Sequence, residues 1–173
     1  MEEIELEKTY LAKYIPDLTA CEYKEMSDTY LPESANHPVI RIRKQGETYM
    51  ITKKAPVGDN AAVQKEQTIY LTKQEYDDLL RISNKKVEKI RYYYQVGGRK
   101  VEIDVFQGAL CGLILIDVEF SSEQEMNVFE MPEFCLVEVT HESFIAGGLL
   151  AGKSYQDIGD KLTKYNYSPL FFM

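Results

Sequence analysis

The feature that most constrains this chain is a set of short segments in which charged and apolar residues alternate. Such alternation is typical of strands with one buried face and one polar face. The sign of the charge is uniform within a segment and changes between segments. The acidic rows are Glu5 and Glu7, Glu102 and Asp104, and Asp117 and Glu119, and the basic rows are Arg41 and Arg43, and Lys89 and Arg91. The pattern predicts a sheet whose polar face carries ordered charge of both signs.

The same segments predict an α+β fold built on a large antiparallel sheet. Alternation runs through residues 4–10, 39–44, 48–54, 89–96, 100–106 and 113–120. Many strands joined by short turns favour a barrel or a sharply curled sheet. A helix is predicted at 72–80, because Thr72 and Glu75 have capping-box spacing, and further helix is expected from Glu142 onward. With 173 residues and no linker or repeat, we expect one domain spanning residues 1–173.

Two glycine-containing turns allow strand pairing to be predicted. A two-residue turn at Gly97-Gly98 would place Arg91 directly opposite Asp104.

The second turn is placed at Gln45-Gly46. It would put Arg43 opposite Thr48 and Arg41 opposite Met50.

Composition excludes several classes of protein. A net charge of −8 argues against binding nucleic acid through a basic surface. No apolar run reaches the length of a membrane helix, and the acidic N-terminus does not resemble a secretory signal, so no membrane partner is expected. Three scattered cysteines predict a reducing, cytoplasmic location. With two histidines, a histidine-centred triad or a zinc cluster is nearly excluded.

Two interpretations of the charged face are open. It is either the solvated outer face of an ordinary sheet or the lining of an internal tunnel. Like charges gathered in a tunnel repel one another, so a charged tunnel requires a ligand or ions. Arginine and lysine bind polyanions, and carboxylates bind Mg²⁺ or Mn²⁺. A polyphosphate with a metal ion would require both sets in one cavity.

Taken in order, these motifs resemble the triphosphate tunnel metalloenzyme (CYTH) superfamily, which includes class IV adenylate cyclases, thiamine triphosphatases and inorganic tripolyphosphatases. The resemblance covers residues 3–151 and implies eight antiparallel strands closed into a tunnel with flanking helices. The motifs that carry it are Glu5-Leu6-Glu7-Lys8-Thr9, Arg41-Ile42-Arg43, Thr52-Lys53-Lys54, Lys89-Ile90-Arg91, Glu102-Ile103-Asp104, Asp117-Val118-Glu119 and Glu138-Val139-Thr140.

The resemblance also implies a role for each charged row, with Mg²⁺ or Mn²⁺ as cofactor. The implied metal ligands are Glu5, Glu7, Asp117 and Glu119. The implied substrate-binding residues are Arg41, Arg43, Lys54, Lys89, Arg91, Glu66, Glu102 and Asp104. The implied catalytic residues are Glu5, Glu7 and Lys89.

Three positions depart from the family pattern. Thr9 stands where the family has a lysine, and Lys8 has the opposite parity, so its side chain is expected to point out of the tunnel. The segment Glu66-Gln67-Thr68 keeps one of two alternating acids. Gly147-Gly148 lies where the family has an asparagine.

We expect metal-dependent hydrolysis of a triphosphate, either inorganic tripolyphosphate or an organic triphosphate, by an activated water. Two alternatives are open. One is a class IV adenylate cyclase that forms cyclic AMP from ATP, and the other is a non-catalytic polyphosphate-binding tunnel. The apolar tail at residues 169–173 would either pack on the barrel or contribute to a homodimer.

Overall fold

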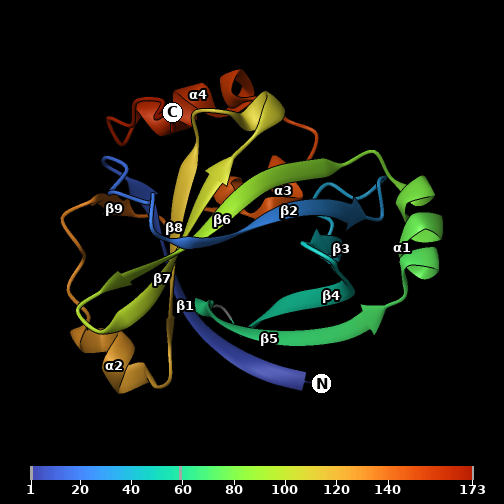
Figure 1. Cartoon of the computed structure of the whole chain (residues 1–173), viewed down its shortest axis with the longest axis horizontal. Coiled ribbons are helices and arrows are strands. Elements are labelled where there is room, and N and C mark those ends of the chain that lie inside the picture. The colour runs from blue at the N-terminus through green and yellow to red at the C-terminus, as the bar shows by residue number, and fades with distance from the viewer. Residues whose placement is uncertain (1, 59, 173) are drawn as a thin grey trace.

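The computed structural model describes residues 2–58 and 60–172, with side chains described from Ile4 onward. Its strands are β1 (Glu2–Ala12), β2 (Glu22–Leu31), β3 (Ile40–Gln45), β4 (Thr48–Val57), β5 (Asn60–Leu71), β6 (Lys86–Val96), β7 (Arg99–Phe106), β8 (Ile114–Phe120) and β9 (Cys135–Glu138). Within the described ranges they form one nine-stranded antiparallel sheet in the order β5-β4-β3-β2-β6-β7-β8-β1-β9, and pairing of β5 with β1 closes all but β9 into a barrel (Figure 1). The predicted α+β barrel of eight strands is confirmed.

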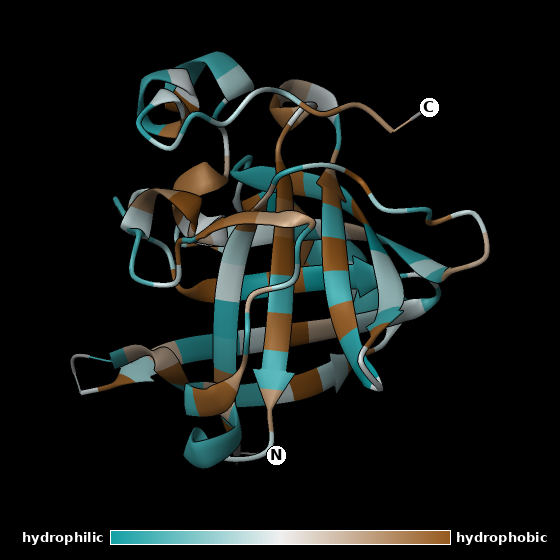
Figure 2. Ribbon diagram, turned by 90° about the vertical axis from the view of Figure 1, so that its left-hand side faces the viewer, coloured by the Kyte–Doolittle hydropathy of each residue, from teal (hydrophilic) through white to brown (hydrophobic). Residues whose placement is uncertain are grey.

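The apolar core lies outside the barrel wall rather than inside it. Val101, Ile103, Ile116 and Val118 alternate with the acids of β7 and β8, and none of the four has solvent-exposed surface. They pack in a cluster with Phe134 and other residues that cover the outer surface of the barrel. Figure 2 shows the resulting alternation of polar and apolar residues along the strands. Small barrels usually fill their interior with side chains. Here the apolar residues pack on the outer surface instead, so the inward-facing positions can carry charged side chains.

Four α-helices in the described ranges flank the barrel: α1 (Lys73–Leu79), α2 (Glu123–Val128), α3 (Gly147–Leu150) and α4 (Tyr155–Thr163). Thr72 and Glu75 form the predicted capping box of α1. Helical structure beyond Glu142 is interrupted, with a short 3₁₀ turn before α3 and a new capping box of Ser154 and Asp157 at α4. Figure 1 shows α1 and α2 on different sides of the barrel. None of the described helices is long and apolar enough to cross a membrane.

The register of the Gly97-Gly98 hairpin is confirmed, because Arg91 pairs with Asp104 as predicted.

The predicted pairing at the second turn is wrong by two residues. The turn is Gly46-Glu47 rather than Gln45-Gly46, and Arg43 lies opposite Met50 rather than Thr48. The cause is the positive φ of 55° at Gly46, which suits glycine at the first position of a hairpin turn. The other pairs shift equally, so Arg41 is not opposite Met50 either. A shift of two leaves the same side chains facing inward.

The C-terminal tail packs on the barrel as far as it is described. The backbone N–H of Leu170 donates to the carbonyl of Gly112 at 3.0 Å, and the Phe172 ring lies 5.2 Å from the Tyr92 ring. Met173 lies outside the described residues, and the homodimer stays a prediction.

Candidate active site

The barrel encloses a cavity of about 560 Å³, within the size range of small-molecule sites. The charged rows face this cavity, so the interpretation as a solvated outer face is wrong. The lining includes every residue to which the sequence assigns a role: Glu5, Glu7, Arg41, Arg43, Lys54, Glu66, Lys89, Arg91, Glu102, Asp104, Asp117 and Glu119. The structure therefore brings the predicted site together in one place, while the individual roles stay predictions.

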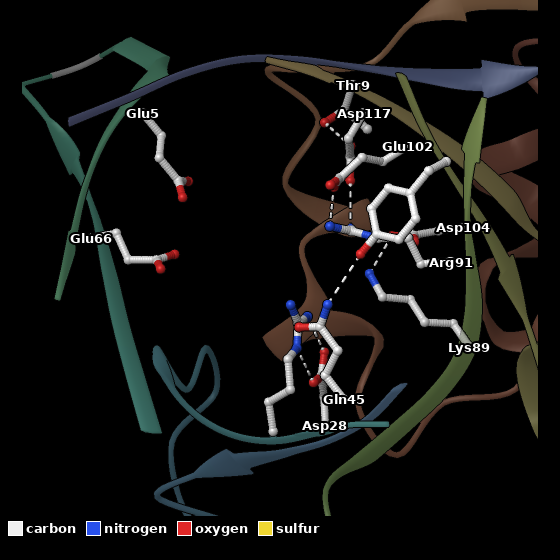
Figure 3. A network of polar contacts seen from close by, with 12 residues as sticks. Glu5, Thr9, Asp28, Gln45, Glu66, Lys89, Arg91, Glu102, Asp104 and Asp117 are labelled. Carbon is white, nitrogen blue, oxygen red and sulfur yellow. Dashed lines mark hydrogen bonds and ion pairs between the residues drawn. The ribbon is translucent and has the colours of Figure 1, made fainter. Parts of the chain in front are cut away.

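Arg91 on β6 is the centre of an ion-pair network. Its Nε and Nη2 donate to the two carboxylate oxygens of Asp104, each at 2.7 Å. The same guanidinium contacts Glu102, and Nη2 lies 3.3 Å from an oxygen of Asp117. Lys89 bonds to Asp104 from the next inward position of β6. Figure 3 shows this cluster on one wall, with Glu5 pointing toward it from across the cavity.

Opposing effects set the pKa values within this cluster. Burial alone would raise the pKa of Asp104, but Arg91 and Lys89 outweigh it and hold that pKa well below the ordinary value. Burial lowers the pKa of Lys89, and the neighbouring Arg91 lowers it further, against the attraction of Asp104. Lys89 therefore releases a proton more readily than an ordinary lysine.

A second buried pair joins Arg43 on β3 to Asp28 on β2. The two residues lie opposite each other, and Nε and Nη2 of Arg43 donate to the two oxygens of Asp28, each at 2.7 Å. Asp28 is 2% exposed. Burial would raise its pKa, but Arg43 outweighs burial and lowers it to about 2. Sequence reasoning missed Asp28, because both alternating sets of β2 residues mix polar with apolar side chains and the strand was not predicted.

Lys54 on β4 holds two acids from neighbouring strands. Its ammonium bonds to Glu5 on β1 and lies 3.4 Å from Glu66 on β5. Arg41 lies 3.9 Å from the same Glu66. The hydroxyl of Thr68 donates to Glu66 at 2.7 Å, so the residue that replaces a family acid supports the acid that is kept.

The wall formed by β1 and β8 carries more negative than positive charge, because Lys54 and Arg91, which contact Glu5 and Asp117, are each shared with other acids. Glu7 and Glu119 lie directly opposite each other, at a spacing where like charges destabilise a sheet. Neither carboxylate forms an ion pair among the described residues. Burial, followed by the charge of Glu102, raises the pKa of Glu119 to about 7. Burial and then Glu7 raise the pKa of Asp117 to about 6.

The donor chemistry of this wall fits a hard divalent cation, which prefers carboxylate oxygens. Within residues 4–58 and 60–172, no three acid, histidine or cysteine groups surround a common point. Glu5 is turned toward Lys54, and Asp117 accepts a hydrogen bond from the Thr9 hydroxyl at 2.8 Å. Glu7 and Glu119, which have no ion-pair partner among the described residues, nonetheless leave negative charge on this wall that a bound cation would neutralise.

The residues that depart from the family pattern have defined positions. Thr9 faces the cavity, where its hydroxyl binds Asp117 in place of a cation. Its backbone N–H donates to Thr140 Oγ1 at 3.1 Å. Lys8 does not line the cavity and lies 3.6 Å from Glu138 on β9.

Gly147-Gly148 belongs to the segment that forms one end of the cavity wall. A Cβ atom on Gly147 would lie 1.9 Å from the Tyr30 hydroxyl, and one on Gly148 would lie 2.1 Å from the Pro38 carbonyl oxygen. Close packing against β2 and the residues before β3 therefore requires glycine here. His37 and His141 also line the cavity.

No model of a known protein family matches the chain. The inorganic triphosphatase of Nitrosomonas europaea is 31% identical over 151 residues, which cover 80% of this chain and 90% of that protein. This chain belongs to the triphosphate tunnel (CYTH) superfamily. The inward charged rows described above therefore belong to a tunnel protein, and the predicted family is confirmed.

Solved structures of tunnel proteins agree with this assignment. A crystal structure of the inorganic triphosphatase NE1496 has a TM-score of 0.63 at 28% identity, covering 85% of this chain and 93% of that one. A proposed adenylate cyclase from Bacillus halodurans has a TM-score of 0.54 at 18% identity, covering 99% of this chain and 95% of that one. The second likeness shows the shared fold alone.

Proposed function

We propose that this protein is a metal-dependent triphosphatase that cleaves inorganic tripolyphosphate inside the barrel. The observation that carries the proposal is a single cavity of about 560 Å³ into which basic side chains and an acidic wall both point. The inorganic triphosphatase of Nitrosomonas europaea, at 31% identity, supports the inorganic substrate over an organic one.

The proposed phosphate-binding groups are Arg41, Arg43, Lys54, Lys89 and Arg91. Arg43 is held in place by Asp28 through Nε and Nη2, which leaves further guanidinium donors for phosphate. The Nε atom of Arg41 is buried and has no hydrogen-bond partner within the described residues. An unpaired buried donor is costly, and a phosphate oxygen at this position would accept its hydrogen bond.

The proposed metal ligands are Glu5, Glu7, Asp117 and Glu119. A bound Mg²⁺ or Mn²⁺ supplies charge neutralisation of the phosphates and lowers the pKa of a water molecule. Asp117 lies 3.3 Å from Arg91, so the metal ion and the substrate phosphates would be bound side by side in the cavity.

In the reaction, the oxygen of water bonds to the terminal phosphorus while the bridging P–O bond breaks. Tripolyphosphate and water give orthophosphate and pyrophosphate. Glu5 and Glu7 are the proposed carboxylates that orient the water and accept its proton. Lys89, whose pKa burial lowers, is the proposed group that neutralises the oxygen of the departing pyrophosphate.

Phosphate release from tripolyphosphate tests this proposal. We expect turnover with Mg²⁺ or Mn²⁺ and none in excess chelator, and we expect Glu7→Gln and Arg43→Ala to abolish it. Lys53→Ala on the outer face of β4 is the matched control, because Lys53 does not line the cavity. Release in excess chelator would contradict the proposal. Binding without release would favour the non-catalytic tunnel, and cyclic AMP from ATP would favour the cyclase.

We further propose that residues 1–173 act as one tunnel domain. A triphosphate is the proposed small-molecule partner, with no role for nucleic acid or membrane. Cytoplasmic location and homodimerisation stay predictions from the sequence.

A further inference from the structure

The inward faces of β2, β6 and β7 continue past the phosphate-binding groups to a basic rim, formed by Lys24 and Lys100 around Tyr93. Tyr93 lines the cavity, and its hydroxyl accepts a hydrogen bond from Gln45 Nε2 at 3.1 Å. The ammonium of Lys100 lies 4.8 Å from the centre of the Tyr93 ring, and that of Lys24 lies 5.9 Å from it. The ring thus gathers two cations at the edge of the cavity.

Strand register connects this rim to the site. Lys24 on β2 lies directly opposite Arg91 on β6, and such partners have Cβ atoms about 5 Å apart. Lys100 on β7 lies opposite Gln95 and shares the inward face of Glu102, two residues along its strand. Both lysines therefore extend the basic part of the cavity toward solvent.

The rim differs from the cavity interior in how its charge is neutralised. Arg91 contacts three carboxylates, whereas Lys24 and Lys100 form no ion pair among the described residues. Both lysines are exposed. Glu22, opposite Tyr93 on β2, is also exposed and lies beyond ion-pair distance of either lysine among these residues. The rim thus carries free positive charge where a polyanion would leave the cavity.

We propose that Lys24 and Lys100 form a rim subsite that binds the outer phosphates of a linear inorganic polyphosphate whose end occupies the triphosphate site. This inference rests on the proposed function and extends its substrate class to chains longer than tripolyphosphate. Each added phosphate carries charge that a lysine ammonium can bind. A nucleotide base fits the rim less well, because the Tyr93 ring already contacts two ammonium groups and its hydroxyl is tethered by Gln45.

The test is calorimetric binding of tripolyphosphate and of long-chain linear polyphosphate, without metal, so that no turnover is required. The variant is Lys24→Ala/Lys100→Ala. The matched control is Lys13→Ala/Lys53→Ala, which also removes two exposed lysines but none that lines the cavity or the rim. Because the variant loses two exposed ion pairs with phosphate, it should bind the long chain about tenfold more weakly than the wild type does. The change for tripolyphosphate should be smaller, and the difference between the two ligands should disappear at high salt.

The rim subsite would be overturned if the variant bound both ligands equally more weakly, or if its affinity did not change. The same loss of affinity in the control variant would also overturn it. If the Lys24→Ala/Lys100→Ala variant lost more affinity for ATP than for polyphosphate, the rim subsite would be overturned in favour of a nucleotide site. Phosphate release from tripolyphosphate by the wild type is measured separately. A protein that binds long chains through the rim but releases no phosphate would contradict the proposed function and leave the subsite supported.

Discussion

The two walls of the cavity differ in how far the charge of their carboxylates is neutralised. On β2 and β7, Asp28 and Asp104 each bond to a guanidinium through both oxygens, and their pKa values are lowered although both are almost fully buried. On β8, the pKa values of Asp117 and Glu119 are raised to about 6 and about 7, by burial first and then by neighbouring acids. One wall is neutralised within the protein, and the other is left with excess negative charge.

This difference explains how one small cavity can serve a polyanion and a cation together. The paired wall holds its arginines in fixed positions, so less ordering is needed when phosphate binds. On the acidic wall, Glu7 and Glu119 lie opposite each other with no ion-pair partner among the described residues, so their oxygens are available to a bound cation. Removing a charge from the paired wall should therefore lower the free energy of unfolding, whereas removing one from the acidic wall should raise it.

The largest effect is expected from Arg91→Ala on the paired wall. It would leave Asp104, Glu102 and Asp117 without their shared partner, and removing one side of a buried ion pair costs about 3–5 kcal/mol. Urea unfolding measures the loss of free energy. Arg91→Met/Asp104→Leu should recover part of it, because the double variant removes one of the three carboxylates that Arg91→Ala leaves around Lys89. A loss as small as that of a surface variant would refute the paired wall.

Asp28→Asn tests the same wall more gently. It keeps the shape of the side chain but removes the negative charge that faces Arg43, and we expect a loss of about 2 kcal/mol in unfolding free energy. The KM for tripolyphosphate should rise as well, since Arg43 is no longer held in place. Glu25→Gln, at an exposed position on the same strand, is the control. Unchanged stability and KM would show that Asp28 does not position Arg43.

On the acidic wall, Glu119→Gln should stabilise the metal-free protein at pH 8 by about 1 kcal/mol, less than the full pKa shift implies, because solvent screens the exposed carboxylate. An unfolded glutamate titrates near its ordinary pKa, whereas the pKa of folded Glu119 is about 7. Between these values the folded state binds more protons, so stability falls as pH rises. Unfolding in chelator at pH 5 and pH 8 measures this slope, which the variant should reduce. A variant less stable than wild type at pH 8 would argue against charge repulsion here.

The smallest effect is expected from Lys8→Ala, outside both walls. The pair with Glu138 is partly exposed and should contribute about 0.5 kcal/mol to unfolding free energy. Phosphate release should be unchanged, because Lys8 does not line the cavity. A large fall in activity would mean that Lys8 replaces the family lysine missing at Thr9.

How much the sequence revealed depended on whether a residue belonged to a regular pattern. Rows such as Asp117 and Glu119 alternate with purely apolar residues, so their strand and their shared face were predictable. The glycines at Gly97-Gly98 set the hairpin register correctly. Parity alone left open whether the charged rows face solvent or a tunnel. Closure of the barrel decides this, because all inward positions of a closed barrel point to the same space.

The rest required tertiary context. Asp28 lies on a strand with no clean alternation, and its importance comes from pairing with Arg43 on the next strand. The split between a paired and an acidic wall depends on strand order around the barrel, which local patterns do not encode. The need for glycine at Gly147 arises from contact with Tyr30, far away in the sequence.

The most direct test of the two-wall arrangement is anomalous scattering from Mn²⁺ in crystals grown with tripolyphosphate and the inactive Glu7→Gln variant, beside wild type with Mn²⁺ alone. We predict Mn²⁺ bound to carboxylate oxygens of the β1–β8 wall, including Glu119, with phosphates against Arg43 and Arg91. Phosphates seated on the β1–β8 wall, or Mn²⁺ bound only elsewhere in wild-type crystals, would contradict it.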